Sequence, residues 1–233
     1  MMNFKKAILL SSVALGLGLT GSAQALIISD SFITPSATTD LTNVTNTLAL
    51  FDSSLGTLNS VTFEISAHSD STTSLVNSSA NSQFFKYDSN LNFLFSTSIA
   101  SLSATLPAAP QLITTLATTG GFQSLASGAT LNLGQIIDQA AFTTPVITTN
   151  LSDYMGAAGS NFDVTCSTLT SSNFTGGGGN ITTNQTTTGQ CDAKIIYDYT
   201  AAVTSNVPAP ASLALLGMGL IGLRFGRKSA KKA

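Results

Sequence analysis

Hydrophobic and polar residues alternate with a period of two along much of this chain. The clearest examples run from Val61 to His68 and from Ala193 to Thr200, where apolar side chains occupy the odd-numbered positions. A period of two is typical of a β-strand that packs one face on a core and exposes the other. Further strand-like segments, rich in Thr, Val, Ile and Phe, lie at 48–51, 112–118, 130–133, 145–149 and 162–170.

Clusters of Gly, Asn and Ser separate these segments, as turns separate short strands. We expect a hairpin in which Phe84–Tyr87 and Phe93–Phe95 pair across the turn residues Asp88-Ser89-Asn90. No stretch has the pattern of a convincing amphipathic helix, and Gln135–Ala141 allows one helical turn or two at most. The pattern as a whole predicts an all-β fold, an antiparallel β-sandwich or jelly-roll-like single domain.

The N-terminal end has the features of a secretory signal peptide. Lys5 and Lys6 precede the apolar run Ala7–Leu19, and Ala23-Gln24-Ala25 is an A-x-A cleavage site. We therefore expect signal peptidase to remove residues 1–25, so that the mature chain begins at Leu26. An uncleaved membrane anchor is the alternative, but the apolar run is shorter than the ~20 residues that a spanning helix needs.

The C-terminal end combines a proline-containing motif, an apolar run and a basic tail. These parts are Val207-Pro208-Ala209-Pro210-Ala211-Ser212, then Leu213–Leu223, then a tail that includes Arg224, Arg227 and Lys228. As a helix, Ala211–Leu223 spans only ~20 Å, against a hydrocarbon core of ~30 Å, so we expect a short, transient span. The basic residues would keep the tail in the cytoplasm. A core helix is the alternative, but this run is apolar on every face.

This order of parts resembles the PEP-CTERM sorting signal of Gram-negative exopolysaccharide producers. The resemblance rests on Val207-Pro208-x-Pro210, on the apolar Ser212–Leu223 with its spaced glycines, and on Arg227-Lys228. It departs from the family at Ala209, which stands where the family has a central Glu. The resemblance implies recognition by an exosortase, a membrane Cys protease, which would cleave near the motif. The motif residues are then substrate and not catalyst.

Composition and charge limit the chemistry of the segment between the two ends. Charged residues make up 9% of the chain, against ~25% in typical domains, while Ser and Thr contribute 31 and 33 residues. Two lysines and all eleven acids lie in the middle, which gives it a net charge of 2 − 11 = −9. Such a body repels phosphate backbones, so we expect no nucleic-acid partner. With one His and two Cys, the chain cannot supply four His/Cys zinc ligands, and we assign no cofactor, metal site or catalytic residue.

Cys166 and Cys191 are the only cysteines. In an exported chain we expect them to form a disulfide that ties down a flexible Gly/Thr/Asn-rich loop between the last two strands. A pair of free thiols is the alternative. Calcium bound across loops by Asp52, Asp153 and Asp163 is a further hypothesis, against solvated turn residues.

The body is similar to a second family, the choice-of-anchor E domain, over about 38–201. The resemblance rests on four stretches, which are Leu50–Leu58 with Val61-Thr62, Tyr154-x-Gly156, Gly178-Gly179-Asn180 and Ile196-Tyr197-x-Tyr199. This family joins a β-rich extracellular domain to several kinds of C-terminal anchor and has no established activity. The resemblance therefore implies an architecture and a location. In physical terms, Asp52–Gly56 indicates a turn in which Gly56 adopts a positive φ.

These observations predict a signal peptide (1–25), an extracellular β-domain (26–206) and a sorting signal (207–233). We expect an exported, exosortase-sorted protein of the cell envelope or extracellular matrix, with a structural or interaction role and no catalysis of its own. Its partners would be signal peptidase, exosortase, transiently the inner membrane, and exopolysaccharide. A carbohydrate-binding module is the main alternative, although the chain has no Trp and four Tyr. A secreted hydrolase with paired acids is less favoured, because Glu64 is the sole Glu.

Overall fold

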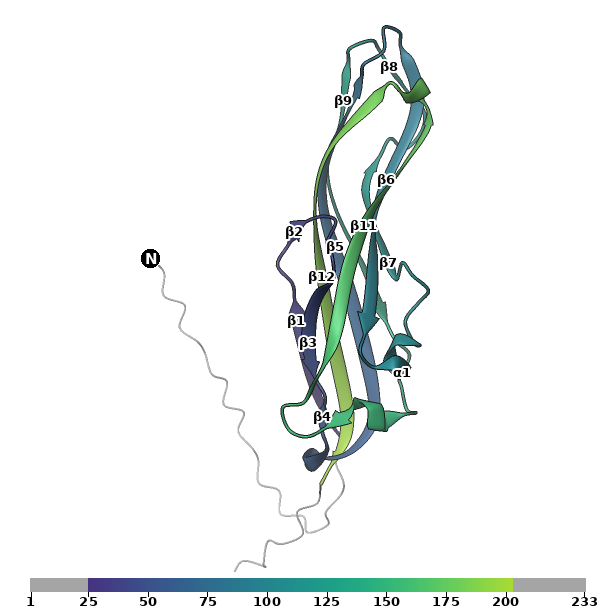
Figure 1. Ribbon diagram of the computed structural model, residues 1–233. Coiled ribbons are helices and arrows are strands. Elements are labelled where there is room, and N and C mark those ends of the chain that lie inside the picture. The colour runs from purple at the N-terminus through teal and green to yellow at the C-terminus, as the bar shows by residue number, and fades with distance from the viewer. Residues whose placement is uncertain (1–24, 203–233) are drawn as a thin grey trace, which may run out of the picture. The chain divides into compact units, whose positions relative to one another are not determined.

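The computed structural model describes residues 25–202, which form one compact unit of two facing β-sheets (Figure 1). Sheet A consists of β1 (Ala25–Ile33), β2 (Ala37–Thr38), β5 (Gly56–Asn77), β9 (Thr130–Thr143) and β12 (Ile181–Ala201). Its strand order is β1-β12-β5-β9, and the short β2 also pairs with β12. Sheet B consists of β3 (Val44–Ala49), β6 (Gln83–Thr97), β7 (Leu112–Thr118), β8 (Gln123–Leu125) and β11 (Asn161–Gly176). Its strand order is β3-β11-β6-β7, and the short β8 also pairs with β6. All pairings within both sheets are antiparallel.

Short elements join the two sheets. A two-stranded parallel ladder pairs β4 (Phe51–Asp52) with β10 (Met155–Gly156). The helical turns are η1 (Ser53–Leu55), α1 (Ala100–Ser103), η2 (Leu151–Tyr154) and η3 (Gly177–Gly179). The expected all-β sandwich is confirmed.

The two segments with the clearest alternation become the two central strands of sheet A. β5 and β12 pair antiparallel over almost their whole length, from Asn77 opposite Ile181 to Gly56 opposite Ala201. The apolar odd-numbered residues of both strands face the core, where Phe63 and Ile195 are fully buried. The period-two pattern therefore identified these strands and their buried faces, but not their length.

Two local expectations are wrong. The predicted hairpin at Asp88–Asn90 is instead the middle of one continuous strand, β6, because these residues pair with β11 on one side and β7 on the other. The predicted helical turns at Gln135–Ala141 lie within β9, which pairs with β5 along its length. In both places the backbone hydrogen bonds to neighbouring strands stabilise an extended chain more than the local sequence favours a turn or a helix. The expected strand at 145–149 is reduced to one isolated bridge, between Ile147 and Val61.

The core consists of two apolar clusters with a layer of hydroxyl groups between them. The large cluster contains Phe63, Phe93 and Tyr197, and the small one contains Leu75, Phe85 and Tyr87. The intervening inward positions are buried Ser and Thr residues, namely Ser69, Ser71, Thr73, Ser89 and Thr187. Hydrogen bonds link several of these groups, among them Ser71 Oγ to Thr187 Oγ1 at 3.1 Å and the Tyr87 hydroxyl to Gln185 Oε1 at 3.1 Å. Buried hydroxyls are tolerated where they pair in this way.

Two aspartates join the sheets at opposite edges of the sandwich. Asp30 on β1 accepts a hydrogen bond at 2.7 Å from the backbone N–H of Ala49, the last residue of β3. Asp138 on β9 accepts one at 2.7 Å from the backbone N–H of Thr115 on β7. Each carboxylate also accepts from the N–H of the residue that follows it. Each carboxylate thereby binds a backbone N–H at the edge of the opposite sheet that would otherwise lack a hydrogen-bond partner.

We predict that Asp138→Ala lowers the free energy of unfolding by about 1.5–3 kcal/mol, because it removes a charged acceptor and leaves the Thr115 N–H unpaired. Denaturant unfolding of the purified protein measures this change. Asp163→Ala, on the exposed face of β11, is the control and should alter stability by less than ~0.5 kcal/mol. Equal losses for the two variants would contradict a specific role for Asp138.

Candidate functional site

The last residues of β12 are held by the segment that follows β4. The backbone N–H of Ala202 donates to the carbonyl oxygen of Leu55 at 2.9 Å. Gly56 has a φ of +148°, and a Cβ at this position would collide with the carbonyl oxygen of Thr200. Only glycine therefore allows this close approach, and the predicted turn with a positive φ is confirmed. We refer to Leu55, Gly56, Thr200 and Ala202 as the exit clamp, because the chain leaves the domain here.

Asp52 fixes the turn that forms the exit clamp. Its side chain accepts a hydrogen bond at 2.9 Å from the backbone N–H of Ser54 and so caps η1. Donation by the backbone and the side chain of Ser54 lowers the pKa of the Asp52 carboxyl below its usual value. The carboxylate therefore stays ionised and keeps its role as a cap under mildly acidic conditions.

Aromatic side chains pack directly behind the exit clamp. The ring of Phe51 lies 5.8 Å from that of Tyr197 and 5.2 Å from that of Tyr199, measured between centroids. The Tyr197 hydroxyl donates to the Ala49 carbonyl oxygen at 2.8 Å. Burial, followed by the negative charge of Asp30, raises the pKa of Tyr197 far above its usual value, so this hydroxyl stays protonated as a donor. Three of the four sequence stretches that resemble the choice-of-anchor E domain thus meet at this end of the domain.

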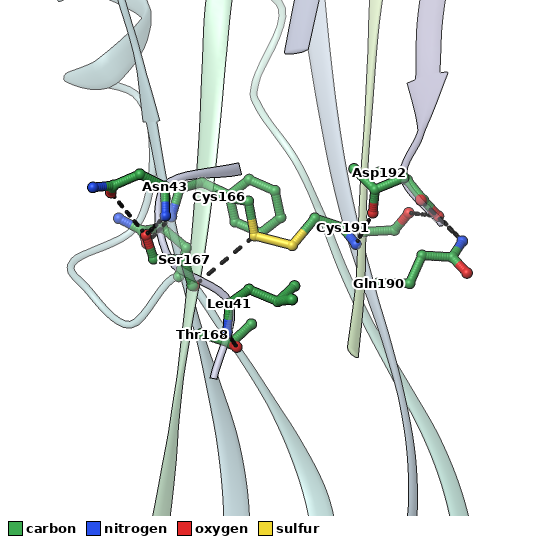
Figure 2. Close-up of a disulfide and its surroundings, with 12 residues drawn as sticks. Leu41, Asn43, Cys166, Ser167, Thr168, Gln190, Cys191 and Asp192 are labelled. Atoms are coloured by element: carbon green, nitrogen blue, oxygen red, sulfur yellow. Dashed lines mark hydrogen bonds between the residues drawn. A yellow bond between two sulfur atoms is a disulfide. The ribbon is translucent and has the colours of Figure 1, made fainter. Parts of the chain in front are cut away.

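The predicted disulfide between Cys166 and Cys191 is confirmed, but its position differs from the prediction. Cys166 lies on β11 of sheet B and Cys191 on β12 of sheet A, with their Cα atoms 6.5 Å apart (Figure 2). Both residues are buried in the large cluster, with exposed fractions of 1% and 0%. The bond therefore crosses the core and joins the two sheets. The residues between the two cysteines are not a flexible loop, because they continue β11 to Gly176 and resume as β12 at Ile181.

Neighbouring segments are fastened to the strands beside the disulfide. The backbone N–H of Leu41 donates to Thr168 Oγ1 at 2.7 Å, and that of Asn43 donates to Ser167 Oγ at 3.0 Å (Figure 2). On the other strand, the N–H of Cys191 donates to Thr34 Oγ1 at 2.8 Å. The connections from β1 to β3 are thereby attached to both bridged strands.

The single histidine belongs to a small polar group on the outer face of sheet A. His68 Nε2 lies 3.6 Å from Asp192 Oδ2, and the two side chains have exposed fractions of 43% and 15%. Gln190 Nε2 donates to both oxygens of the same carboxylate, at 3.0 and 3.2 Å, and Ser66 Oγ donates to it at 3.5 Å. The carboxylate stands between the hydroxyl and the imidazole. This order differs from a catalytic triad, in which the imidazole is bonded to the hydroxyl.

The structure places the remaining predicted residues as follows. Ala25 and Leu26 begin β1, opposite Thr200 and Tyr199. Ala23 and all the residues of the sorting signal from Val207 onward lie outside the described residues. Asp52, Asp153 and Asp163 lie on three separate elements. Within residues 25–202 the structure gathers no three His, Cys, Asp or Glu side chains that could hold a metal ion.

Two features of the described domain were not predicted from the sequence. These are the edge aspartates and an exposed pair of phenylalanines at the far end of sheet B. Among residues 25–202 there is also no helix long and apolar enough to cross a membrane, whereas the apolar run Leu213–Leu223 lies outside that range.

Comparison with known proteins identifies the C-terminal end. Residues 206–229 match the PEP-CTERM protein-sorting motif. No curated protein matches the chain. Among solved structures, a chain of Mud Crab Dicistrovirus is 11% identical over 90% of this chain and 88% of its own length, with a TM-score of 0.18. A chain of the infectious bursal disease virus VP2 subviral particle is 12% identical over 81% of this chain and 42% of its own length, with a TM-score of 0.17. TM-scores this low establish no common fold, so the sorting motif alone informs function.

We predict that replacing both cysteines by Ala lowers the free energy of unfolding by about 2–5 kcal/mol, because the cross-link between the sheets is lost. Cys191→Ser alone should cost more than Cys191→Ala, since it places a hydroxyl in an apolar core. Denaturant unfolding measures both effects, and non-reducing peptide mapping should recover the linked pair. Two titratable thiols per chain in the exported protein would contradict the bridge.

We predict that Gly56→Ala loosens the exit clamp. The added Cβ must displace the end of β12, so the free energy of unfolding should fall by more than ~1 kcal/mol. Hydrogen exchange of the Ala202 amide should accelerate more than that of amides near the disulfide. Gly121→Ala is the matched control, because its φ is ordinary and an added Cβ meets no atom within 4 Å. Unchanged exchange at Ala202 would show that Gly56 is not required there.

Proposed function

We propose that this protein is an exported exosortase substrate whose β-domain has a structural or interaction role at the cell surface or in the extracellular matrix of a Gram-negative bacterium. The sorting motif carries the proposal, because it begins at residue 206, directly after the domain. Such a motif implies export and processing by exosortase at the membrane. The short distance along the chain from the exit clamp to the motif supports processing close to the folded domain.

Chain length limits how far the sorting motif can lie from the domain. Five residues lead from Ala202 to Val207, and an extended chain covers at most ~3.6 Å per residue, or ~18 Å in total. Pro208 and Pro210 favour an extended backbone, which is the form in which proteases bind peptides. We infer that exosortase cleaves the motif while the exit clamp is formed, which leaves the domain with only a short C-terminal extension.

The proposed route begins with removal of residues 1–25 by signal peptidase. In the folded domain Ala25 and Leu26 are already within β1, so cleavage between them is easiest before this strand pairs with β12. The apolar run Leu213–Leu223 would then hold the precursor in the inner membrane until exosortase acts. The basic residues Arg224, Arg227 and Lys228 would keep the tail on the cytoplasmic side.

A non-catalytic role is supported by how the domain uses its reactive side chains. The only His shares its Asp partner with Gln190 and Ser66, in an order unlike that of a nucleophile and its base. Both cysteines form the bridge. The grouping of the Phe51, Tyr154 and Tyr197 stretches around the exit supports our assignment of the body to the choice-of-anchor E type, in which a β-domain precedes an exchangeable anchor.

Mass spectrometry of the mature protein tests this proposal in cells that contain an exosortase and in cells that lack it. We expect a first residue of Leu26 and loss of Leu213–Leu223 only where exosortase is present. Replacing both Pro208 and Pro210 by Ala should allow the helix to extend outward, so that full-length precursor accumulates in the membrane.

Replacement of Pro107 by Ala, within the β-domain, is the matched control and should leave processing unchanged. A surface protein that still contains Leu213–Leu223 in exosortase-positive cells would overturn the sorting proposal. A mature chain that retains Lys5 and Lys6 would overturn the expected signal cleavage.

A further inference from the structure

The end of the domain opposite the exit clamp is formed by several turns. Register brings Asn77 opposite Ile181, Gln83 opposite Leu125 and Phe85 opposite Gly176. The turn after β5, β8, η3 and the start of β9 therefore lie together, at the top of Figure 1. We call this region the tip. In a chain that is attached through its C-terminal end, the tip is the part of the domain farthest from the attachment along β12.

Two exposed phenylalanines stack on each other at the tip. The rings of Phe84 and Phe122 have centroids 4.9 Å apart and planes inclined by 13°. Their exposed fractions are 62% and 49%. By contrast, all four tyrosines of the chain are buried. Phe84 lies on the outer face of sheet B, while its neighbour Phe85 fills the small cluster, so the exposed pair is not part of the core. Contiguous exposed apolar surface of this kind is typical of sites that bind a ligand or another molecule.

The turns and strand ends of the tip, in the stretches 71–85, 119–137 and 164–191, contain no Asp, Glu, Lys, Arg or His. Lys86 and Asp88 follow on β6, on the same outer face as Phe84, and they neutralise each other in an ion pair with an N–O distance of 3.0 Å. Hydroxyl groups adjoin Phe84 on this outer face. Ser124 pairs with Phe84 across the ladder, and Ser82 Oγ lies 3.4 Å from Ser124 Oγ. Gln83 and Gln123 lie on the opposite face of their strands, since they pair with the buried Leu125 and Phe85, and their amides donate to Ser79 Oγ and the Thr119 carbonyl oxygen.

We propose that the tip is a binding site for a neutral glycan, with Phe84 and Phe122 as the platform. A pyranose ring presents a face of C–H bonds whose positive partial charge matches the negative face of an aromatic ring. Its hydroxyl groups match the hydroxyl side chains of Ser82 and Ser124, which fix the orientation of the sugar. Because Lys86 and Asp88 neutralise each other, the face has no net charge, which favours a ligand without carboxylate, sulfate or phosphate groups. This inference goes beyond sorting and does not depend on it.

The same observations disfavour a membrane surface as the occupant. Interfacial segments combine aromatic or aliphatic anchors with Lys and Arg that bind anionic headgroups. The one basic residue beside the pair on β6, Lys86, is already bound to Asp88. The Ser82 and Ser124 hydroxyls and this ion pair would have to be desolvated in an acyl environment without compensation.

Titration of the exported, purified protein with neutral hexasaccharides of glucose, mannose, galactose and xylose tests the site. Isothermal calorimetry gives the affinity, and NMR shift mapping gives the location. We expect at least one neutral sugar to bind and to shift the signals of Phe84, Phe122 and Ser124. Phe84→Ala should weaken the affinity about tenfold, the effect of losing ~1.4 kcal/mol. Phe84→Trp should strengthen it, because indole offers a larger platform.

Ile113→Ala is the matched control, since Ile113 is an exposed apolar residue on the same sheet, opposite Asn92 and away from the tip. It should leave the affinity unchanged, and circular dichroism should show that every variant is folded. Polygalacturonate and phosphatidylcholine vesicles serve as comparison ligands. The proposal is overturned if no neutral sugar binds at millimolar concentration, if only polygalacturonate or vesicles bind, or if Phe84→Ala binds as the wild type does. Loss of sorting in cells has no bearing on this result, so the two proposals fail separately.

Discussion

The long antiparallel pairing of β5 with β12 determines the rest of the structure. The two strands run beside each other from the exit clamp to the tip, and β1 and β9 add to their outer edges. Because side chains alternate, one register sets every inward residue on both strands at once. A slip by one position would expose Phe63 and Ile195 and bury Glu64 and Lys194 instead. Sheet B then packs on the face that this register creates.

A domain so rich in Ser and Thr can still maintain this register because its polar residues pair with one another. Several of the buried hydroxyls between the two apolar clusters are hydrogen-bonded, as Ser71 is to Thr187 on β12 and Ser89 is to the Ser171 carbonyl oxygen on β11, whereas the Ser69 hydroxyl has no partner among residues 25–202. At the edges, Asp30 and Asp138 supply the contacts between sheets that apolar side chains supply in a larger core. The disulfide adds a covalent link through the middle. Low charge and many hydroxyls are thus compatible with a specific fold.

The sequence predicted those features that depend on local alternation. It identified the strand class, the inward residues from Val61 to Ala67, the Gly56 turn and the two cysteines as partners. It failed where long-range pairing decides the outcome. Asp88-Ser89-Asn90 is a turn signal by itself, but ladders on both sides keep it extended. The sequence suggested a loop between the two cysteines, because the local composition of residues 167–190 does not show that they continue β11 and begin β12. The edge aspartates and the Phe84–Phe122 pair likewise join residues that are remote in sequence.

The position of Cys191 within β12 has a mechanical consequence for a protein that is attached at its C-terminal end. Tension from the attachment enters at Ala201 and runs along β12, so it loads the hydrogen bonds to β1 and β5 in shear, and these must break together. If they do break, only the eleven residues from Asp192 to Ala202 can be extracted. At Cys191 the load passes through the disulfide into β11 of the opposite sheet. The segment of β12 from Ile181 to Gln190 is thereby relieved of tension, and the tip can stay folded while the base of the domain yields.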